Sequence, residues 1–154
     1  MSKQKKKYHL AMCGKYYVAA ELHRRGIAAS VTYGNAKKAD VIATSEDGER
    51  ALVIEVKTTS QPKWVVGQYV PEPSERIWVF VHVPTEETSA PSFFVVTQTE
   101  IHAILHPITE EYNRRYKEKH GVEYGGKPGV CSLKKTQIVE SESAWEKIIS
   151  RLSN

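Results

Sequence analysis

The chain has 154 residues, of which 40% are hydrophobic and 26% charged, and this length and composition predict a single globular domain with its own core. Its formal charge of +4 is compatible with nucleic acid as a partner but does not demand one. No run approaches the roughly 20 apolar residues that a membrane span needs. Cys13 and Cys131 lie far apart without metal-type spacing, and His9 and Lys15 interrupt the only early apolar segment. A disulfide framework and a signal peptide are therefore not expected, and a cytoplasmic location is.

The chain begins with a basic segment that contains four lysines, Lys3, Lys5, Lys6 and Lys7. We expect residues 1–7 to be a disordered tail and residues 8–154 to form one domain. The tail has two alternative roles, which are to keep the protein soluble or to contact nucleic acid.

Apolar residues recur at helical spacing from residue 8 to residue 25, and Gly26 is expected to end this helix. Glu21 lies beside the apolar stripe, where an acid needs a partner. Either Glu21 pairs with Arg25 one turn later on the surface, or it points toward a functional site.

Three apolar runs outside the central part of the sequence predict strands at residues 27–33, 77–83 and 92–96. The second run is almost continuously apolar, as is typical of a strand that is covered on both faces. Residues 59–73 are mostly polar and contain prolines, which predicts a loop over the site described below.

The last third of the chain predicts helices. Thr97 and Glu100 form a capping-box pattern that opens a short helix, and Pro107 is expected to begin a new segment. A charged helix is predicted at residues 109–120, followed by a glycine-rich loop. Ser143 and Glu146 form the cap of a last helix, whose expected core residues are Trp145, Ile148, Ile149 and Leu152.

Residues 39–58 contain two apolar runs on either side of a polar segment with an Asp-Gly pair, which predicts a β-hairpin. Residues 51–54 are expected to be buried on both faces. If residues 46–49 form the loop, Asp40 lies directly opposite Glu55, and directly opposed residues share a face with Cβ atoms about 5 Å apart. Lys57 lies on that same face, since side chains alternate along a strand.

Two carboxylates this close repel unless a cation lies between them, and Mg²⁺ prefers oxygen ligands. Lys57 is then placed to hold an attacking water or to stabilise developing negative charge. An alternative is that Glu55 and Lys57 only mark the point where a core strand emerges into solvent.

Asp40 followed by Glu55-Val56-Lys57 at the end of a hydrophobic strand resembles the core of the PD-(D/E)XK nuclease superfamily, which includes restriction endonucleases and Holliday-junction resolvases. The resemblance covers roughly residues 8–97. Ala39 stands where many members have proline. Further patterns, at Trp64, at residues 78–81 and at residues 93–96, are similar to those of small stand-alone members of undetermined role.

Alternating helix and strand patterns predict an α/β fold, a central mixed β-sheet with the first helix on one side and the later helices on the other. The resemblance implies that this is a restriction endonuclease-like core with helices on both sides of the sheet. It implies a Mg²⁺-dependent nuclease, with Mn²⁺ able to substitute, and with DNA favoured over RNA. Asp40, Glu55 and the backbone carbonyl of Val56 would hold the metal ion. Lys57 would complete the catalytic set, and Glu21 would hold a second ion or one of its waters.

Four more residues are candidates for contacts with the substrate, namely Lys37, Lys38, Thr58 and Gln68. A different class of function stays open at this point, a nuclease-like module that binds nucleic acid or a partner protein without cleaving it. The sequence does not distinguish between substrates or pathways, and it leaves a homodimer as one alternative for the oligomeric state.

Overall fold

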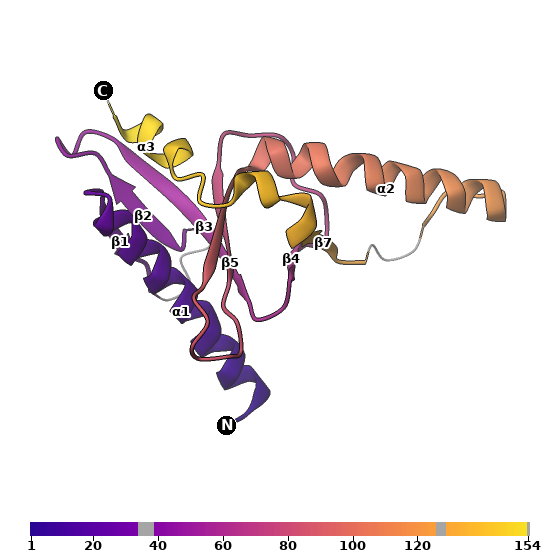
Figure 1. Ribbon diagram of the computed structural model, residues 1–154. Helices are drawn as coiled ribbons and strands as arrows, with labels where there is room; N and C mark the ends of the chain where they lie inside the picture. Colours follow the sequence, from indigo (N-terminus) through magenta and orange to yellow (C-terminus); the bar gives the residue numbers. More distant parts are fainter. Residues whose placement is uncertain (34–38, 126–128, 154) are drawn as a thin grey trace.

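The computed structural model describes residues 1–33, 39–125 and 129–153 (Figure 1). Its helices and strands follow in the order α1 (Lys3–Arg24), β1 (Ala28–Val31), β2 (Val41–Thr44), β3 (Ala51–Thr59), β4 (Lys63–Gly67), β5 (Ile77–His82), β6 (Ser92–Thr97), α2 (Gln98–His120), β7 (Cys131–Lys134) and α3 (Glu146–Leu152), with two short 3₁₀ turns, at Lys135–Gln137 and Val139–Ser141, between β7 and α3.

Five strands form a mixed sheet in the order β1-β2-β3-β5-β6. Only β3 and β5 run parallel to each other in this sheet, and the other neighbouring pairs are antiparallel. The connection between β3 and β5 contains β4, which pairs with β7 in a separate two-stranded sheet. The predicted α/β class with a central mixed sheet is confirmed, whereas the loop predicted at residues 59–73 is wrong where β4 forms.

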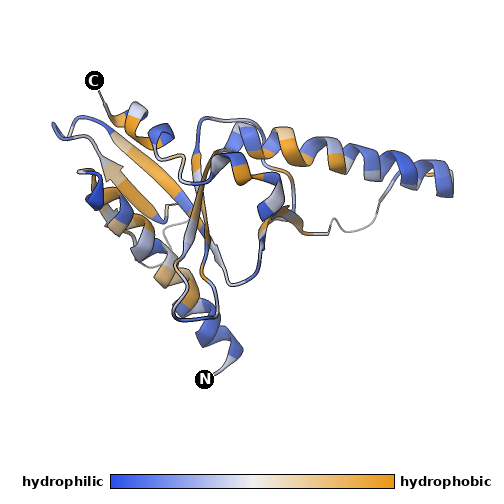
Figure 2. Ribbon diagram, in the orientation of Figure 1, coloured by the Kyte–Doolittle hydropathy of each residue, from blue (hydrophilic) through white to orange (hydrophobic). Residues whose placement is uncertain are grey.

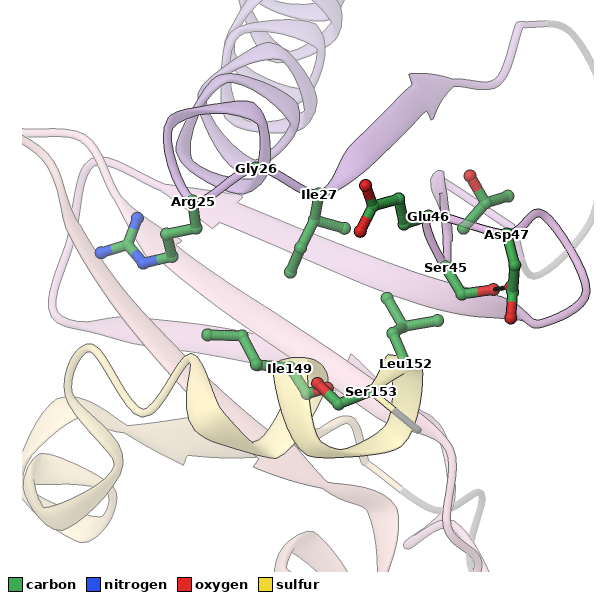
Figure 3. A pocket seen from close by; sticks show the side chains of 10 residues that line it. Arg25, Gly26, Ile27, Ser45, Glu46, Asp47, Ile149, Leu152 and Ser153 are labelled. Carbon is green, nitrogen blue, oxygen red and sulfur yellow. Dashed lines mark hydrogen bonds between the residues drawn. The ribbon is translucent and has the colours of Figure 1, made fainter.

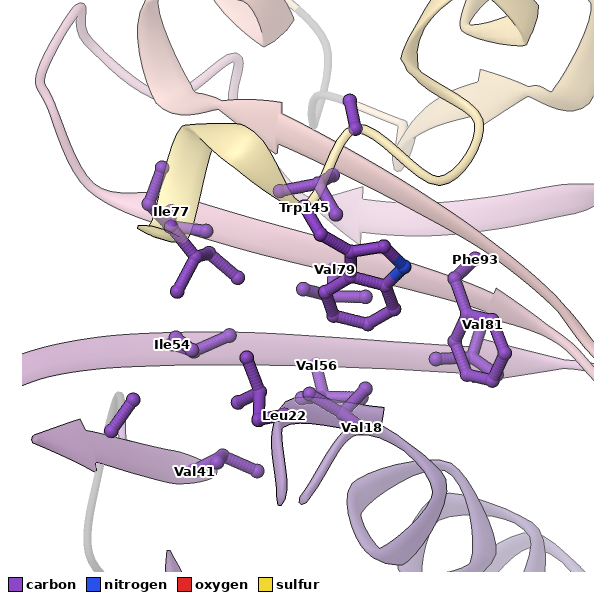
Figure 4. Close-up of a cluster of buried hydrophobic side chains, with 14 of the residues drawn as sticks. Val18, Leu22, Val41, Ile54, Val56, Ile77, Val79, Val81, Phe93 and Trp145 are labelled. Atoms are coloured by element: carbon purple, nitrogen blue, oxygen red, sulfur yellow. The ribbon is translucent and has the colours of Figure 1, made fainter. Parts of the chain in front are cut away.

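One face of the large sheet packs against both α1 and α3. Val18 and Leu22 of α1 meet Ile54 and Val79 of the sheet, and the indole of Trp145 closes the same cluster (Figure 4). The last helix therefore joins the first one, although we expected the later helices on the opposite face. Its apolar stripe fits either face, so a local pattern could not decide between them.

The opposite face of β5 and β6 is covered by the small sheet and by the start of α2. Trp64 of β4 packs its ring edge-on against Phe80 and Phe94, with both ring centroids 5.6 Å away. Ile101 and Leu105 are the buried residues of α2 among those described. The strand β5 is thus buried on both faces, as its apolar run predicted.

The helix α1 begins earlier than expected, because the Ser2 side chain caps it by accepting a hydrogen bond from the Lys5 backbone N–H at 3.3 Å. The prediction of a disordered tail is therefore wrong for residues 3–7, which form the first turns of α1. The predicted end of the helix is confirmed. Gly26 follows α1 with a φ of 76°, a conformation that glycine adopts without a steric penalty.

The helix α2 is continuous from Gln98 to His120, so the break predicted at Pro107 is wrong. The capping box at Thr97 and Glu100 is confirmed. Proline removes one backbone hydrogen bond, but ion pairs of Glu111 with arginines three and four residues later support the second half of the helix. That half extends away from both sheets and is mostly hydrophilic (Figures 1 and 2).

Three smaller expectations also fail. Ser143 does not cap α3, which has Trp145 at its N-terminus without a side-chain cap, and Ile149 is exposed. Residues 51–54 are not buried on both faces, since Ala51 and Val53 are exposed. Ile149 of α3 and Ala51 and Val53 of the hairpin therefore face solvent. No helix in the described part of the chain has the length and apolarity to cross a membrane.

Candidate functional site

The hairpin of β2 and β3 has the register that the sequence predicted. Val41 pairs with Ile54, and the Ser45 N–H donates to the Arg50 carbonyl at 2.9 Å across a loop of residues 46–49. The Asp40 N–H likewise donates to the Ile54 carbonyl at 3.1 Å. Extending the pairing by one residue places Asp40 opposite Glu55.

The Asp40 carboxylate is held from two sides. Its Oδ2 accepts a hydrogen bond from the Val56 N–H at 2.8 Å, and its Oδ1 lies 2.7 Å from Lys15 Nζ of α1. The Thr32 N–H donates to the Asp40 backbone carbonyl at 3.0 Å. Asp40 is therefore tied to the Glu55-Val56-Lys57 segment, to α1 and to the end of β1.

The Glu55 carboxylate lies between two cations of its own. Its oxygens are 3.4 Å from Lys57 Nζ and 3.9 Å from Arg76 Nη1, and the side chain is only 15% exposed. Lys57 Nζ also lies 5.5 Å from the ring centroid of Trp78, a residue of β5 that pairs with Glu55 of β3. Carboxylate, lysine and indole therefore form one packed group on this face of the sheet.

Glu21 is engaged elsewhere. Its carboxylate lies 2.5 Å from Arg25 Nη1 and 3.5 Å from Arg24 Nη1. The hydrogen bond from Arg25 outweighs partial burial and lowers the pKa of Glu21 below its ordinary value. These contacts match the alternative in which Glu21 pairs on its own helix, so the structure gives no support to a second metal ligand.

All four candidate substrate contacts also fall outside this group or outside the described residues. The Thr58 hydroxyl is buried under α1 beside Gly14, on the face opposite to Glu55 and Lys57, and has no hydrogen-bond partner among the described residues. Lys37 and Lys38 lie outside the described residues. Gln68 is exposed after β4, where its carbonyl accepts from the Cys131 thiol at 3.8 Å.

Sequence reasoning missed Lys15 and Arg76, the two cations that approach Asp40 and Glu55 from other elements. A signal for Lys15 was present, because it lies four residues before Ala19 and seven before Leu22, on the buried side of α1. The charge of Lys15 beside a buried stripe needs an acidic partner. Arg76 directly precedes a buried strand, but nothing local indicated which acid it would meet.

Hard donors for one cation are present at the site, although they are few. Among the described residues, no three His, Cys, Asp or Glu side chains cluster as a metal site. Mg²⁺ commonly binds through one or two carboxylates and keeps several waters. Asp40 and Glu55 are opposed in register and partly buried, but Asp40 pairs with Lys15 of α1, whereas Glu55 and Lys57 lie beside Trp78 on the face opposite to α1. To share one ion, both carboxylates would have to leave these partners.

A cavity of about 530 Å³ lies at the other end of the hairpin (Figure 3). It is bounded by Gly26, by the hairpin loop at Glu46 and Asp47, and by Ile149 and Leu152 of α3. Asp40, Glu55 and Lys57 do not line it, so this cavity is not part of the candidate site. No family model and no curated protein matches the sequence.

Proposed function

We propose that the protein is a Mg²⁺-dependent nuclease that hydrolyses phosphodiester bonds, with DNA favoured as the substrate. The observation that carries this proposal is the hydrogen bond from the Val56 N–H to Asp40, in a register that opposes Asp40 to Glu55. Lys57 follows on the face of Glu55. The strand order and directions support a restriction endonuclease-like core as the specific fold.

In this proposal Asp40, Glu55 and the Val56 backbone carbonyl would hold the metal ion. Mg²⁺ bound there would supply activation of water and neutralisation of charge on the scissile phosphate. Lys57 would orient the attacking water or stabilise the negative charge that develops on the phosphate. Trp78 restricts the position of the Lys57 ammonium group, since its ring lies 5.5 Å away.

Lys15 and Arg76 have a second part in the proposal. Lys15 pairs with Asp40 at 2.7 Å, and Arg76 lies 3.9 Å from Glu55. Near a bound substrate, the same cations are available to the phosphate oxygens. On binding, Asp40 and Glu55 would leave their ion pairs and hold the metal ion. Lys15 and Arg76 would then contact the phosphate group.

The test compares wild type with Asp40→Asn and Lys57→Met on duplex, single-stranded and branched DNA and on RNA, with Mg²⁺, Mn²⁺ or EDTA. Asparagine still accepts from the Val56 N–H but loses the charge, and methionine keeps the packing on Trp78. We expect cleavage by wild type with metal only, and a loss of at least about 100-fold in both variants.

Metal binding separates the two variants. Lys57→Met should bind Mn²⁺ as wild type does in calorimetry, whereas Asp40→Asn should bind it at least about tenfold more weakly, because one carboxylate holds such an ion poorly. Glu87→Gln and Lys119→Ala, at exposed positions, are matched controls that should cleave normally. Cleavage that survives Asp40→Asn would contradict the nuclease proposal.

A binding module without cleavage is the second candidate, and one observation favours it. Asp40 and Glu55 are each neutralised by side chains of the protein itself, at 2.7 Å for Lys15 and 3.4 Å for Lys57, and such pairs need no metal ion. If wild type binds nucleic acid but cuts none of the substrates, and Asp40→Asn changes nothing, this second function holds.

A further inference from the structure

Two exposed tyrosines meet beside the candidate site. Tyr16 of α1 and Tyr33, which follows β1, are 50% and 67% exposed, and their hydroxyl groups are hydrogen-bonded to each other. The bond fixes two aromatic rings from distant parts of the sequence in one place on the surface. Exposed aromatic rings held in this way are a platform on which an unpaired base can stack.

Both tyrosines directly follow residues that hold Asp40. Lys15, which precedes Tyr16, forms the ion pair with the Asp40 carboxylate at 2.7 Å. Thr32, which precedes Tyr33, donates its backbone N–H to the Asp40 carbonyl at 3.0 Å. The tyrosine pair is therefore attached to the same two segments that position the proposed metal ligand.

The surface that leads to this pair is basic. Residues 1–20 contain five lysines and no acid, while the rest of the chain has 17 basic and 18 acidic residues. The first turns of α1 are exposed and hydrophilic (Figure 2). Lys5 and Tyr16 share a face, because eleven residues are close to three helical turns and span about 16 Å.

We propose that α1 and the Tyr16–Tyr33 pair form a binding surface for single-stranded nucleic acid, with the lysines along the backbone phosphates and unpaired bases stacked on the tyrosines. This inference deepens the proposed function, since it assigns a single-stranded segment beside the scissile phosphate. In a duplex the base faces are covered by their neighbours, so a stacking platform favours unpaired nucleotides. A partner that is merely acidic would need the lysines but not the rings.

The experiment measures fluorescence anisotropy of a labelled single-stranded oligonucleotide and of its duplex in EDTA, so that no cleavage is required. Wild type should bind the single strand at least about tenfold more tightly than the duplex. Replacing Tyr16 and Tyr33 by leucine should weaken single-strand binding by about 5- to 100-fold and leave duplex binding nearly unchanged. Replacing both by phenylalanine should weaken single-strand binding less than leucine does, because the rings remain although the bond between them is lost.

Tyr69→Leu is the matched control, as Tyr69 is 70% exposed on another part of the surface and should not affect binding. Lys5→Gln with Lys6→Gln should weaken binding and reduce the slope of log affinity against log salt by about 0.7 for each lost phosphate contact. The inference would be overturned if polyglutamate displaced the labelled single strand as well as the unlabelled strand does. Equal binding of the single strand by wild type and the double leucine variant would also overturn it.

The outcomes also distinguish this inference from the proposed function. If Asp40→Asn loses cleavage but the tyrosine variants bind as wild type does, the nuclease proposal is supported and the single-strand surface is contradicted. If binding depends on the tyrosines but wild type cleaves no substrate, the single-strand surface is supported and the nuclease proposal is contradicted.

Discussion

In the proposed function, the ion pair between Lys15 and Asp40 would compete with a divalent cation for the Asp40 carboxylate. A lysine ammonium group 2.7 Å from the carboxylate occupies one of the positions that a metal ion would use. Both side chains are partly exposed, at 19% and 23%, so solvent screening limits the strength of the pair to roughly 1 kcal/mol.

Lys15→Met should therefore strengthen metal binding. Removing the competing charge should lower the Mn²⁺ dissociation constant by about fivefold, the equivalent of roughly 1 kcal/mol. Calorimetry without nucleic acid measures this directly, with Lys7→Met at an exposed position of the same helix as the control. Unchanged or weaker Mn²⁺ binding in Lys15→Met would argue that Asp40 is a structural partner of Lys15 and not a metal ligand.

Part of the site could be predicted from the sequence because its determinants are local. This hairpin has a side-chain period of two residues and a loop of four, so a short stretch of sequence decides that Asp40 opposes Glu55 and that Lys57 lies on the face of Glu55. The partners Lys15 and Arg76 depend on how α1 and β5 pack against this hairpin. Packing between distant elements leaves little local trace, so these cations were missed.

At the level of elements, α1 packs closely on β3. A Cβ added at Gly14 would lie 1.8 Å from the Thr58 hydroxyl oxygen and 2.8 Å from its Cβ, distances that no packed structure tolerates. Glycine costs about 1 kcal/mol in a helix interior relative to alanine. The close approach explains why a glycine is present there despite this cost.

Gly14→Ala should consequently destabilise the protein by about 1–3 kcal/mol, although alanine is the better helix former, because the methyl group forces α1 away from β3. Thermal and urea unfolding measure the loss. Thr58→Ala in the same chain should restore part of it by removing the hydroxyl and one methyl group. Ala20→Gly, at an exposed position of α1, is a control for propensity alone, and a stabilised Gly14→Ala variant would contradict the close packing.

The elements that the sequence mispredicted share a physical cause. The strand β4 has few local signals and forms because β7, far along the chain, supplies its partner. The helix α2 continues through Pro107 because ion pairs and the capping box favour helix on both sides of it. In both cases interactions beyond the local window override the preference of single residues.

At the scale of the whole molecule, the C-terminal segment passes around the edge of the large sheet. It leaves β7 on the face of α2, pairs Glu142 with Phe94 of the edge strand β6, and ends in α3 on the opposite face. The Ser143 N–H also donates to the Phe93 carbonyl at 2.8 Å. This crossing covers part of an edge strand that would otherwise be open to pairing with another chain.

Lys147 links the C-terminal segment to α2 and to β6. Its Nζ lies 2.7 Å from Glu100 Oε1 and 3.0 Å from the Val95 carbonyl oxygen. Burial acts to raise the pKa of Glu100, but hydrogen bonds from Lys147 and from the Thr97 backbone and hydroxyl outweigh it, and the pKa lies below its ordinary value of 4.5. Glu100 therefore contributes stability that is fully present above about pH 4.5 and is lost as the pH falls through its lower folded-state pKa.

Glu100→Gln should lower the free energy of unfolding at pH 7 by about 1 kcal/mol, a modest value because the Glu100 side chain is 41% exposed and its ion pair is partly screened. Glutamine still fits the capping box, so the loss isolates the charge. Urea unfolding of wild type and variant between pH 7 and pH 3 should show the difference shrinking with acid, since wild type loses the same charge by protonation. Glu87→Gln, at an exposed turn position, should show no difference at pH 7. If the difference in the free energy of unfolding between wild type and Glu100→Gln stayed constant down to pH 3, an ionised Glu100–Lys147 pair at this crossing would be contradicted.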